Sequence, residues 1–134
     1  AAPGKRMLSS MTPTIATKDG AVLALGSPGG RTIINTVVLV LVNLIDHGMN
    51  LQTAVDAPRF HHQWLPDRIE VEAFGLSPDT LSLLEGRGHH VLKMDRDSSQ
   101  GRLQAVLRQA DGTLLGAADR RKPDSAAVGV SPPR

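Results

Sequence analysis

The sequence has no cysteine, no tyrosine, and only two phenylalanines and one tryptophan in 134 residues. Without cysteine the chain has no disulfide bond, no thiol nucleophile and no thiolate ligand for a metal. Few aromatic rings are present on which bases or sugars could stack. The chain is 40% hydrophobic, which is enough for one globular domain, so we expect an aliphatic core. Any catalysis must use hydroxyl, backbone or charged groups.

An excess of one charge sign is also lacking. The 15 lysines and arginines face 13 acidic residues, a formal net charge of +2, which does not favour nucleic acid or an anionic membrane as partner. The longest apolar segment, residues 32–47, contains Asn35, Asn43 and Asp46 and is shorter than the roughly 20 residues of a membrane span. We expect a central helix there, with a buried strand as the alternative. No leader-peptide pattern follows Ala1.

Turn and cap signals divide the chain into short elements. Asp19-Gly20 and Asp111-Gly112 each lie between apolar runs, as in β-hairpins. We expect a single domain over residues 1–134 with a loose tail at 120–134 and a polar loop at 59–66. Helices are expected at 32–47, 50–57 and from Ser77 to about 85, and strands at 68–72, 91–94, 103–108, 113–118 and twice within 12–26. This order indicates an α+β fold.

The junction at residues 26–30, Gly-Ser-Pro-Gly-Gly, comes between an expected strand and the long helix. A helix start has unpaired N–H groups and partial positive charge, and glycines allow close approach of a ligand. Gly29 and Gly30 could therefore form a phosphate cradle or an oxyanion hole. The alternative is a tight turn without a ligand. The spacing matches neither the phosphate-loop nor the dinucleotide-binding pattern.

Other polar groups have both a structural and a functional interpretation. Ser9 and Ser10 could bind a carboxylate or only cap a local turn. The neighbouring pairs His61-His62 and His89-His90 lack the spacing of metal ligands, so no metal site is expected. Asp119-Arg120-Arg121 could bind an anion, although a solvated charge run is the more common explanation.

Three motifs in register resemble the γ-glutamyltransferases, also called glutathione hydrolases. They are Lys-Arg-Met-Leu-Ser-Ser-Met at residues 5–11, Gly-Ser-Pro-Gly-Gly at 26–30, and Asp-Ala-Pro-Arg-Phe-His-His-Gln-Trp-Leu-Pro at 56–66. The resemblance extends from about Gly4 through Gly129. It implies part of an N-terminal nucleophile hydrolase, a four-layer αββα sandwich to which this chain contributes strands and helices of the small subunit.

The family's activity is γ-glutamyl acyl transfer or hydrolysis on substrates such as glutathione, without metal or cofactor. The resemblance implies that the N–H groups of Gly29 and Gly30 form the oxyanion hole and that Ser9 and Ser10 hold the α-carboxylate. The family's threonine nucleophile would lie upstream of Ala1, so we expect the isolated chain to be inactive. The implied partner is the upstream large subunit of the same precursor.

Two further function classes stay open. One is a non-catalytic module that binds γ-glutamyl groups or anions through Ser9, Ser10, Gly29 and Gly30. The other is an assembly fragment that pairs with another chain or with itself. The resemblance also implies a periplasmic or secreted location for the parent protein, which no segment of the sequence displays.

Overall fold

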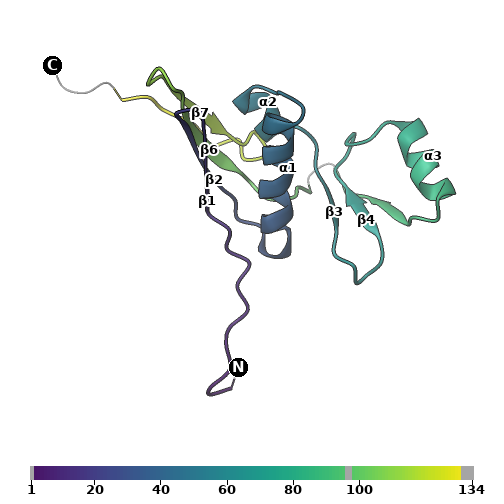
Figure 1. Cartoon of the computed structure of the whole chain (residues 1–134). Coiled ribbons are helices and arrows are strands. Elements are labelled where there is room, and N and C mark those ends of the chain that lie inside the picture. The colour runs from purple at the N-terminus through teal and green to yellow at the C-terminus, as the bar shows by residue number, and fades with distance from the viewer. Residues whose placement is uncertain (1, 96–97, 131–134) are drawn as a thin grey trace.

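The computed structural model describes residues 2–95 and 98–130. Two β-sheets lie on either side of helix α1 (Figure 1). The elements in chain order are β1 (Thr14–Lys18), β2 (Ala21–Gly26), the 3-10 turn η1 (Gly30–Thr32), α1 (Ile33–Ile45), α2 (Leu51–Asp56), β3 (Phe60–His62), β4 (Ile69–Val71), α3 (Pro78–Gly86), β5 (Val91–Lys93), β6 (Gln104–Arg108) and β7 (Leu114–Ala118). This mixture confirms the expected α+β class.

The larger sheet has the strand order β1-β2-β6-β7, and all its neighbours are antiparallel. Asp19 and Gly20 connect β1 to β2 with φ angles of 49° and 81°, as the two central residues of a type I′ hairpin require. The second predicted hairpin connects β6 to β7, where the N–H of Gln109 donates to the carbonyl of Thr113 at 2.8 Å. Both hairpin predictions are confirmed.

The core lies between this sheet and helices α1 and α2. Its buried side chains are aliphatic, as expected: Leu23, Leu25, Val37, Val40, Leu51, Ala54, Val55, Leu103, Ala105 and Ala117. Burial of such side chains stabilises the fold by about 25 cal/mol for each Å² removed from water. The core therefore fixes α1, and with it the turn that precedes α1, against the end of β2.

Helix α1 contains 13 residues, and the helix prediction for this segment is confirmed over the strand alternative. It buries Ile33, Thr36, Val37 and Val40, spaced by three or four residues as on one face of a helix. Asn50 caps the following helix α2, because its Oδ1 accepts the N–H of Thr53 at 2.9 Å. Within the described residues, no helix has the length and apolar character that a membrane crossing requires.

The smaller sheet has the order β3-β4-β5. Strands β3 and β4 are antiparallel, whereas β4 and β5 are parallel and are connected through α3. Ser77 caps α3 as expected, since its Oγ accepts the N–H of Thr80 at 3.4 Å. The prediction of a loop over residues 59–66 is wrong for residues 60–62, which pair with β4 as strand β3. Three residues are too few to show a strand's alternation in the sequence.

The expected loose tail does not begin at Arg120. Asp119 is fully buried, and the side chain of Arg121 is 14% exposed because it donates to the carboxylates of Glu72 and Asp119. Glu72 lies 49 positions from Arg121, too far for the sequence pattern to indicate the pair. Residues 123–130 contain no helix or strand, and residues 131–134 lie outside the described residues.

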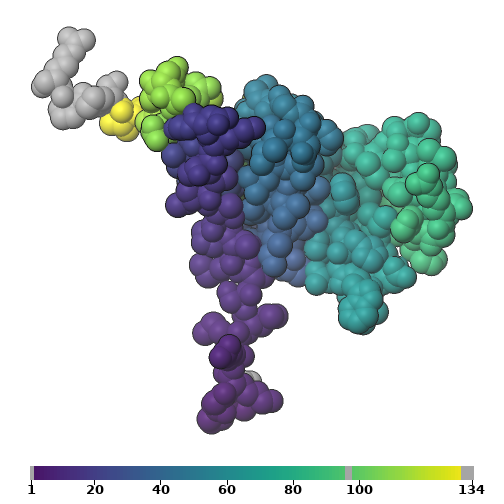
Figure 2. All heavy atoms as spheres, in the orientation of Figure 1, coloured from purple at the N-terminus to yellow at the C-terminus, as the bar shows by residue number. Residues whose placement is uncertain are grey.

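Apolar side chains remain exposed on two surfaces. The segment before β1 projects from the body as an arm (Figure 2), with Met7, Leu8 and Met11 each more than three-quarters exposed, at 88%, 98% and 78%. The outer face of the larger sheet exposes Ile15 and Val106 beside a shallow hollow. Extended apolar surface of this kind is typical of regions that bind another protein segment.

Candidate active site

The glycine turn, residues 26–30, connects the end of β2 to the start of η1. Gly29 and Gly30 have φ angles of 143° and 55°, a backbone conformation that residues other than glycine rarely adopt. A Cβ on Gly29 would lie 2.7 Å from Oγ1 of Thr32 and 3.2 Å from Cα of Gly101. A Cβ on Gly30 would meet nothing within 4 Å. The first glycine is therefore required by space and conformation, the second by conformation alone.

The carbonyl groups of the turn are used inside the protein. The carbonyl of Gly29 accepts the N–H and the hydroxyl of Thr32, at 3.1 and 3.0 Å. The carbonyl of Gly30 accepts the N–H of Ile33 and the hydroxyl of Ser10, the latter at 2.7 Å. In the part of the chain that the structure describes, no acceptor is bonded to the N–H of Gly29 or Gly30. Two adjacent donors at an exposed turn can stabilise a negative oxygen.

The serine pair lies on the arm that precedes β1, and only one of its two members contacts the turn. Ser10 bonds to Gly30, whereas Ser9 is exposed and its Oγ accepts the N–H of Met11 at 3.4 Å. A serine hydroxyl has a single proton to donate. In this conformation the proton of Ser10 is directed at Gly30, so donation to a carboxylate would require the hydroxyl to rotate.

A third segment, residues 99–102, closes against the glycine turn. The Oγ of Ser27 accepts the N–H of Arg102 at 2.9 Å. Gly101 is buried with φ 74°, and a Cβ there would lie 2.6 Å from Oγ of Ser27 and 2.8 Å from Oγ1 of Thr36. A small hollow opens here, lined by Pro28, Gly29, Ser99, Gly101 and Arg102. The sequence assigned no role to this segment, and its glycine was the only sign of the close approach.

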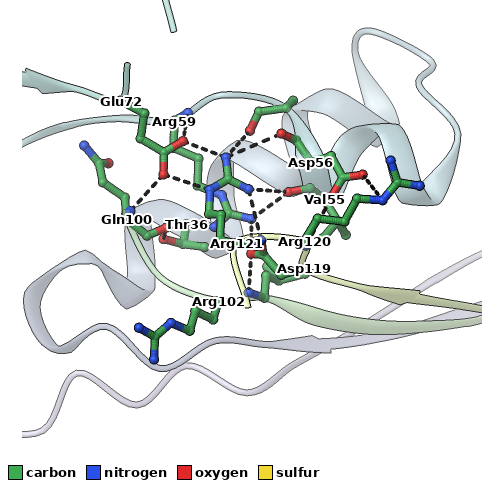
Figure 3. Close-up of polar contacts among 12 residues, drawn as sticks. Thr36, Val55, Asp56, Arg59, Glu72, Gln100, Arg102, Asp119, Arg120 and Arg121 are labelled. Carbon is green, nitrogen blue, oxygen red and sulfur yellow. Dashed lines mark hydrogen bonds and ion pairs between the residues drawn. The ribbon is translucent and has the colours of Figure 1, made fainter. Parts of the chain in front are cut away.

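Two arginines and two acids, Arg59, Glu72, Asp119 and Arg121, form a buried ion cluster (Figure 3). Arg59 and Asp119 are 2% and 0% exposed and are joined at 2.8 Å, and Arg121 contacts Glu72 at 2.6 Å. Each acid also accepts backbone N–H groups, Glu72 from Arg59 and Asp119 from Leu103, both at 2.8 Å. The interpretation of residues 119–121 as a solvated run is thus wrong, because two of the three charges are paired inside the fold.

The acids of this cluster are held ionised. Burial alone would raise the pKa of Glu72, but hydrogen bonds from Arg121 and the N–H of Gln100 outweigh it and lower that pKa. The pKa of Asp119 is lowered in the same way, with burial opposed first by the charge of Arg59. Burial and the charge of Arg121 lower the pKa of Arg59, which still lies in contact with Asp119. The cluster links the 56–66 motif to the end of β7.

Gln100 connects this cluster to the segment beside the turn. Its N–H donates to Glu72 at 2.8 Å, its carbonyl accepts Arg59 at 2.7 Å, and its side-chain amide donates to the carbonyl of Glu70 at 2.8 Å. Gln100 is 1% exposed. It thereby places Gly101 against Gly29. In Figure 3 the side chain of Arg102 instead points away from the cluster.

The neighbouring histidines His61 and His62 have different partners. His61 is buried and its Nε2 lies 2.7 Å from Oε1 of Gln63, whereas Nε2 of His62 lies 3.0 Å from Asp67. Among residues 2–95 and 98–130, no group of three or more histidines and acids could hold a metal ion. Both contacts are made to residues of the connection between β3 and β4, which they hold in place.

Solved structures with the same fold define the class of protein. A γ-glutamyltranspeptidase from Pseudomonas nitroreducens matches with a TM-score of 0.86 at 38% identity, over 98% of this chain and 68% of that chain. One from Helicobacter pylori matches with a TM-score of 0.81 at 43% identity, over 91% of this chain and 66% of that chain. The chain is therefore part of an N-terminal nucleophile hydrolase fold.

The family follows from the sequence comparison. The family model described as gamma-glutamyltranspeptidase matches residues 1–129, and the chain belongs to that family. Glutathione hydrolase proenzyme of Escherichia coli (strain K12) is 51% identical over 128 residues, 95% of this chain and 21% of the relative. Acylase ACY 1 proenzyme of Pseudomonas sp. (strain V22) is 39% identical over 97% of this chain and 22% of the relative. The chain thus spans about a fifth of the length of these curated relatives.

Proposed function

We propose that this chain is part of an enzyme that transfers or hydrolyses γ-glutamyl groups of glutathione and related compounds. In this proposal the N–H groups of Gly29 and Gly30 are the oxyanion hole, and Ser9 and Ser10 bind the α-carboxylate of the substrate. The observation that carries it is the pair of N–H groups that have no acceptor among residues 2–95 and 98–130, beside a serine that contacts Gly30. Two relatives at 51% and 60% identity are both named glutathione hydrolase proenzymes, which supports the γ-glutamyl group as the acyl part.

The reaction is acyl transfer through a nucleophile that lies outside these 134 residues. The hydroxyl of a threonine adds to the γ-carbonyl carbon, and the oxygen that becomes negative accepts the two N–H groups of the turn. The C–N bond then breaks, and the leaving amine takes the proton that the threonine lost. Water or an amine attacks the resulting ester, which releases glutamate or a new γ-glutamyl amide and restores the hydroxyl. One such backbone donor is worth about 3–4 kcal/mol of barrier.

The two serines can bind a carboxylate without leaving a group of the glycine turn unpaired. When a carboxylate binds, the hydroxyl of Ser10 can rotate from the carbonyl of Gly30 to the substrate. The carbonyl of Gly30 then keeps its bond from the N–H of Ile33, so no buried acceptor is abandoned. Ser9 is exposed and has only a long contact, 3.4 Å from the N–H of Met11. Its hydroxyl is available to the same ligand.

The partner is the upstream large subunit of the same precursor. The relatives are named proenzymes and are far longer than this chain, which supports pairing with a further segment. The exposed arm and the apolar outer face of the larger sheet offer surfaces for it. In isolation the same surfaces favour self-association of the chain, which size-exclusion chromatography measures.

The decisive experiment is hydrolysis of γ-glutamyl-p-nitroanilide by the purified chain, alone and after co-expression with the upstream portion of its precursor. We expect activity only in the co-expressed protein. Activity of the chain alone would disprove the placement of the nucleophile outside it. An inactive co-expressed protein that still binds glutamate in calorimetry would favour a binding module, and one that neither acts nor binds would favour an assembly fragment.

We further propose that the parent protein is periplasmic or secreted, as the family resemblance implies. Fractionation of the source cells with an antibody to this chain tests the location. Recovery in the cytoplasmic fraction would overturn it, without bearing on the chemistry above.

A further inference from the structure

Arg31 follows the two glycines directly, and its side chain reaches the other sheet. Its Nη2 lies 2.8 Å from Oε2 and 3.1 Å from Oε1 of Glu70, a residue of β4 that is 39 positions away. The glycine turn is therefore joined to the smaller sheet through one side-chain contact. No spacing in the sequence indicated this pair.

The surroundings of Glu70 favour its ionised form. Its side chain is 9% exposed, and it accepts a second guanidinium, that of Arg68, at 2.9 Å. Burial alone would raise the pKa of Glu70, but the hydrogen bonds from Arg68 and Arg31 outweigh it and keep that pKa below its ordinary value. A buried carboxylate that is charged at neutral pH gives Arg31 a fixed partner, because hydrogen bonds between charged groups are stronger than neutral ones.

The glycine turn needs such external contacts. Glycine adopts positive and negative φ about equally well, so the pair at 29–30 does not fix the direction of its own N–H groups. Thr32 holds the carbonyl of Gly29 from within the turn, and Ser10 holds the carbonyl of Gly30 from the arm. If Ser10 rotates to bind a substrate, as proposed above, its contact with the turn is lost. Two contacts from outside then remain: the bond from the N–H of Arg102 to Ser27 at the start of the turn, and the bond from Arg31, which directly follows Gly30, to Glu70.

We propose that Arg31 and Glu70 are positioning residues, whose ion pair orients the N–H groups of Gly29 and Gly30 toward the reacting oxygen. This inference rests on the proposed function of the turn. Neither residue touches substrate in it: Arg31 acts through the backbone that it shares with Gly30, and Glu70 acts through Arg31. The side chain of Arg31 is 48% exposed, so its effect on stability alone is small.

The test uses the full-length processed enzyme and the variants Arg31→Met and Glu70→Gln, with kcat and KM measured on γ-glutamyl-p-nitroanilide. We expect each variant to lose about ten-fold in kcat, less than removal of a whole oxyanion donor, with KM within about two-fold of the parent value. The double variant should be no worse than either single one, since both changes break the same contact. Arg31→Lys should recover part of the loss, because it keeps the charge.

Arg68→Met is the matched control. It removes a guanidinium from the same carboxylate, but Arg68 lies beside β4 and has no covalent link to the turn. We expect its kcat to change by less than about three-fold, by analogy with exposed ion pairs. Equal losses in Arg31→Met and Arg68→Met would show a role in stability rather than in positioning. A raised KM with unchanged kcat in Arg31→Met would make Arg31 a substrate contact, which also overturns the inference.

Failure of the proposed function has a different signature. It would appear as a full-length protein of natural sequence that is processed but has no γ-glutamyl activity. The crystal structure of Arg31→Met then provides an independent readout. We expect a changed direction of the N–H groups of Gly29 and Gly30, and an unchanged turn would overturn the positioning role whatever the reaction is.

Discussion

The glycine turn and the buried ion cluster differ in how their polar groups are paired. In the turn, two N–H groups have no acceptor among the described residues, and the backbone is held from outside. In the cluster of Arg59, Glu72, Asp119 and Arg121, the charges are paired at 2.6–3.1 Å and the acids also accept backbone N–H groups. Unpaired donors are useful for chemistry and cost little when they are exposed. Paired charges are costly to disturb because they are buried.

Removal of one member of the ion cluster should have the largest effect. Asp119→Ala leaves Arg59 buried without its carboxylate and frees the N–H of Leu103. We expect a loss of about 3–5 kcal/mol in the free energy of unfolding, measured by urea denaturation of the processed enzyme.

Arg120→Ala is the control for that measurement. Arg120 neighbours Asp119 in sequence, but its side chain is 79% exposed and contacts Asp56 at 3.3 Å. We expect a loss below about 1 kcal/mol. If the two variants lost equal stability, the distinction between a buried cluster and a solvated charge run would fail.

In the turn, substitution should affect activity, and Gly29 more than Gly30. The Cβ of Gly29→Ala would collide with Thr32 and approach the backbone of Gly101 at 3.2 Å, which displaces the turn. We expect a loss in kcat of about 10²–10³, as when an oxyanion donor is removed. The Cβ of Gly30→Ala would meet no atom within 4 Å. Its only cost is the left-handed backbone conformation of alanine, about 1–2 kcal/mol, so we expect a smaller loss in kcat.

Steady-state kinetics on both alanine variants, with thermal unfolding as a check on folding, measures the difference. If Gly30→Ala lost more kcat than Gly29→Ala, then Thr32 and Gly101 would be able to move and make room for the Cβ at position 29. Their closeness would then not be the reason for a glycine there.

Acid should weaken the ion cluster before it affects the turn. Because the pKa values of Asp119 and Glu72 are lowered in the folded state, their ionisation stabilises the fold at neutral pH. That contribution is complete above the unfolded-state values, about 3.9 for Asp and 4.3 for Glu, and is lost as the pH falls below them. Unfolding free energies from pH 7 to 3 should therefore fall more steeply for the parent protein than for Asp119→Asn. Parallel curves would contradict a depressed pKa of Asp119.

Local sequence signals predicted much of the fold, but they could not predict contacts between residues far apart in the chain. Asp19-Gly20 and Asn50 act within a few residues of their own positions, so the sequence was sufficient for the hairpin and the helix cap. Arg59 and Asp119 are 60 positions apart, and only the fold brings them together. For the site, the glycine pair and a family resemblance pointed to the turn. The contacts that Ser10 and Arg31 make around it, across 20 and 39 positions, left no pattern in the sequence.

The smallest predicted effect distinguishes the two serines. Ser9 has no contact with the turn, whereas Ser10 bonds to the carbonyl of Gly30 at 2.7 Å. If both bind the α-carboxylate, each alanine variant should raise KM by several-fold, since one hydrogen bond is worth about 1 kcal/mol. The rise in KM should be smaller for Ser10→Ala than for Ser9→Ala, because the hydroxyl of Ser10 gives up its bond to Gly30 when it turns to the substrate. Neither variant should change kcat by more than about two-fold, since Ser10 no longer contacts the turn once the substrate is bound. A kcat lowered only in Ser10→Ala, measured in γ-glutamyl-p-nitroanilide hydrolysis, would show that Ser10 continues to hold Gly30 in the complex and does not turn to the carboxylate.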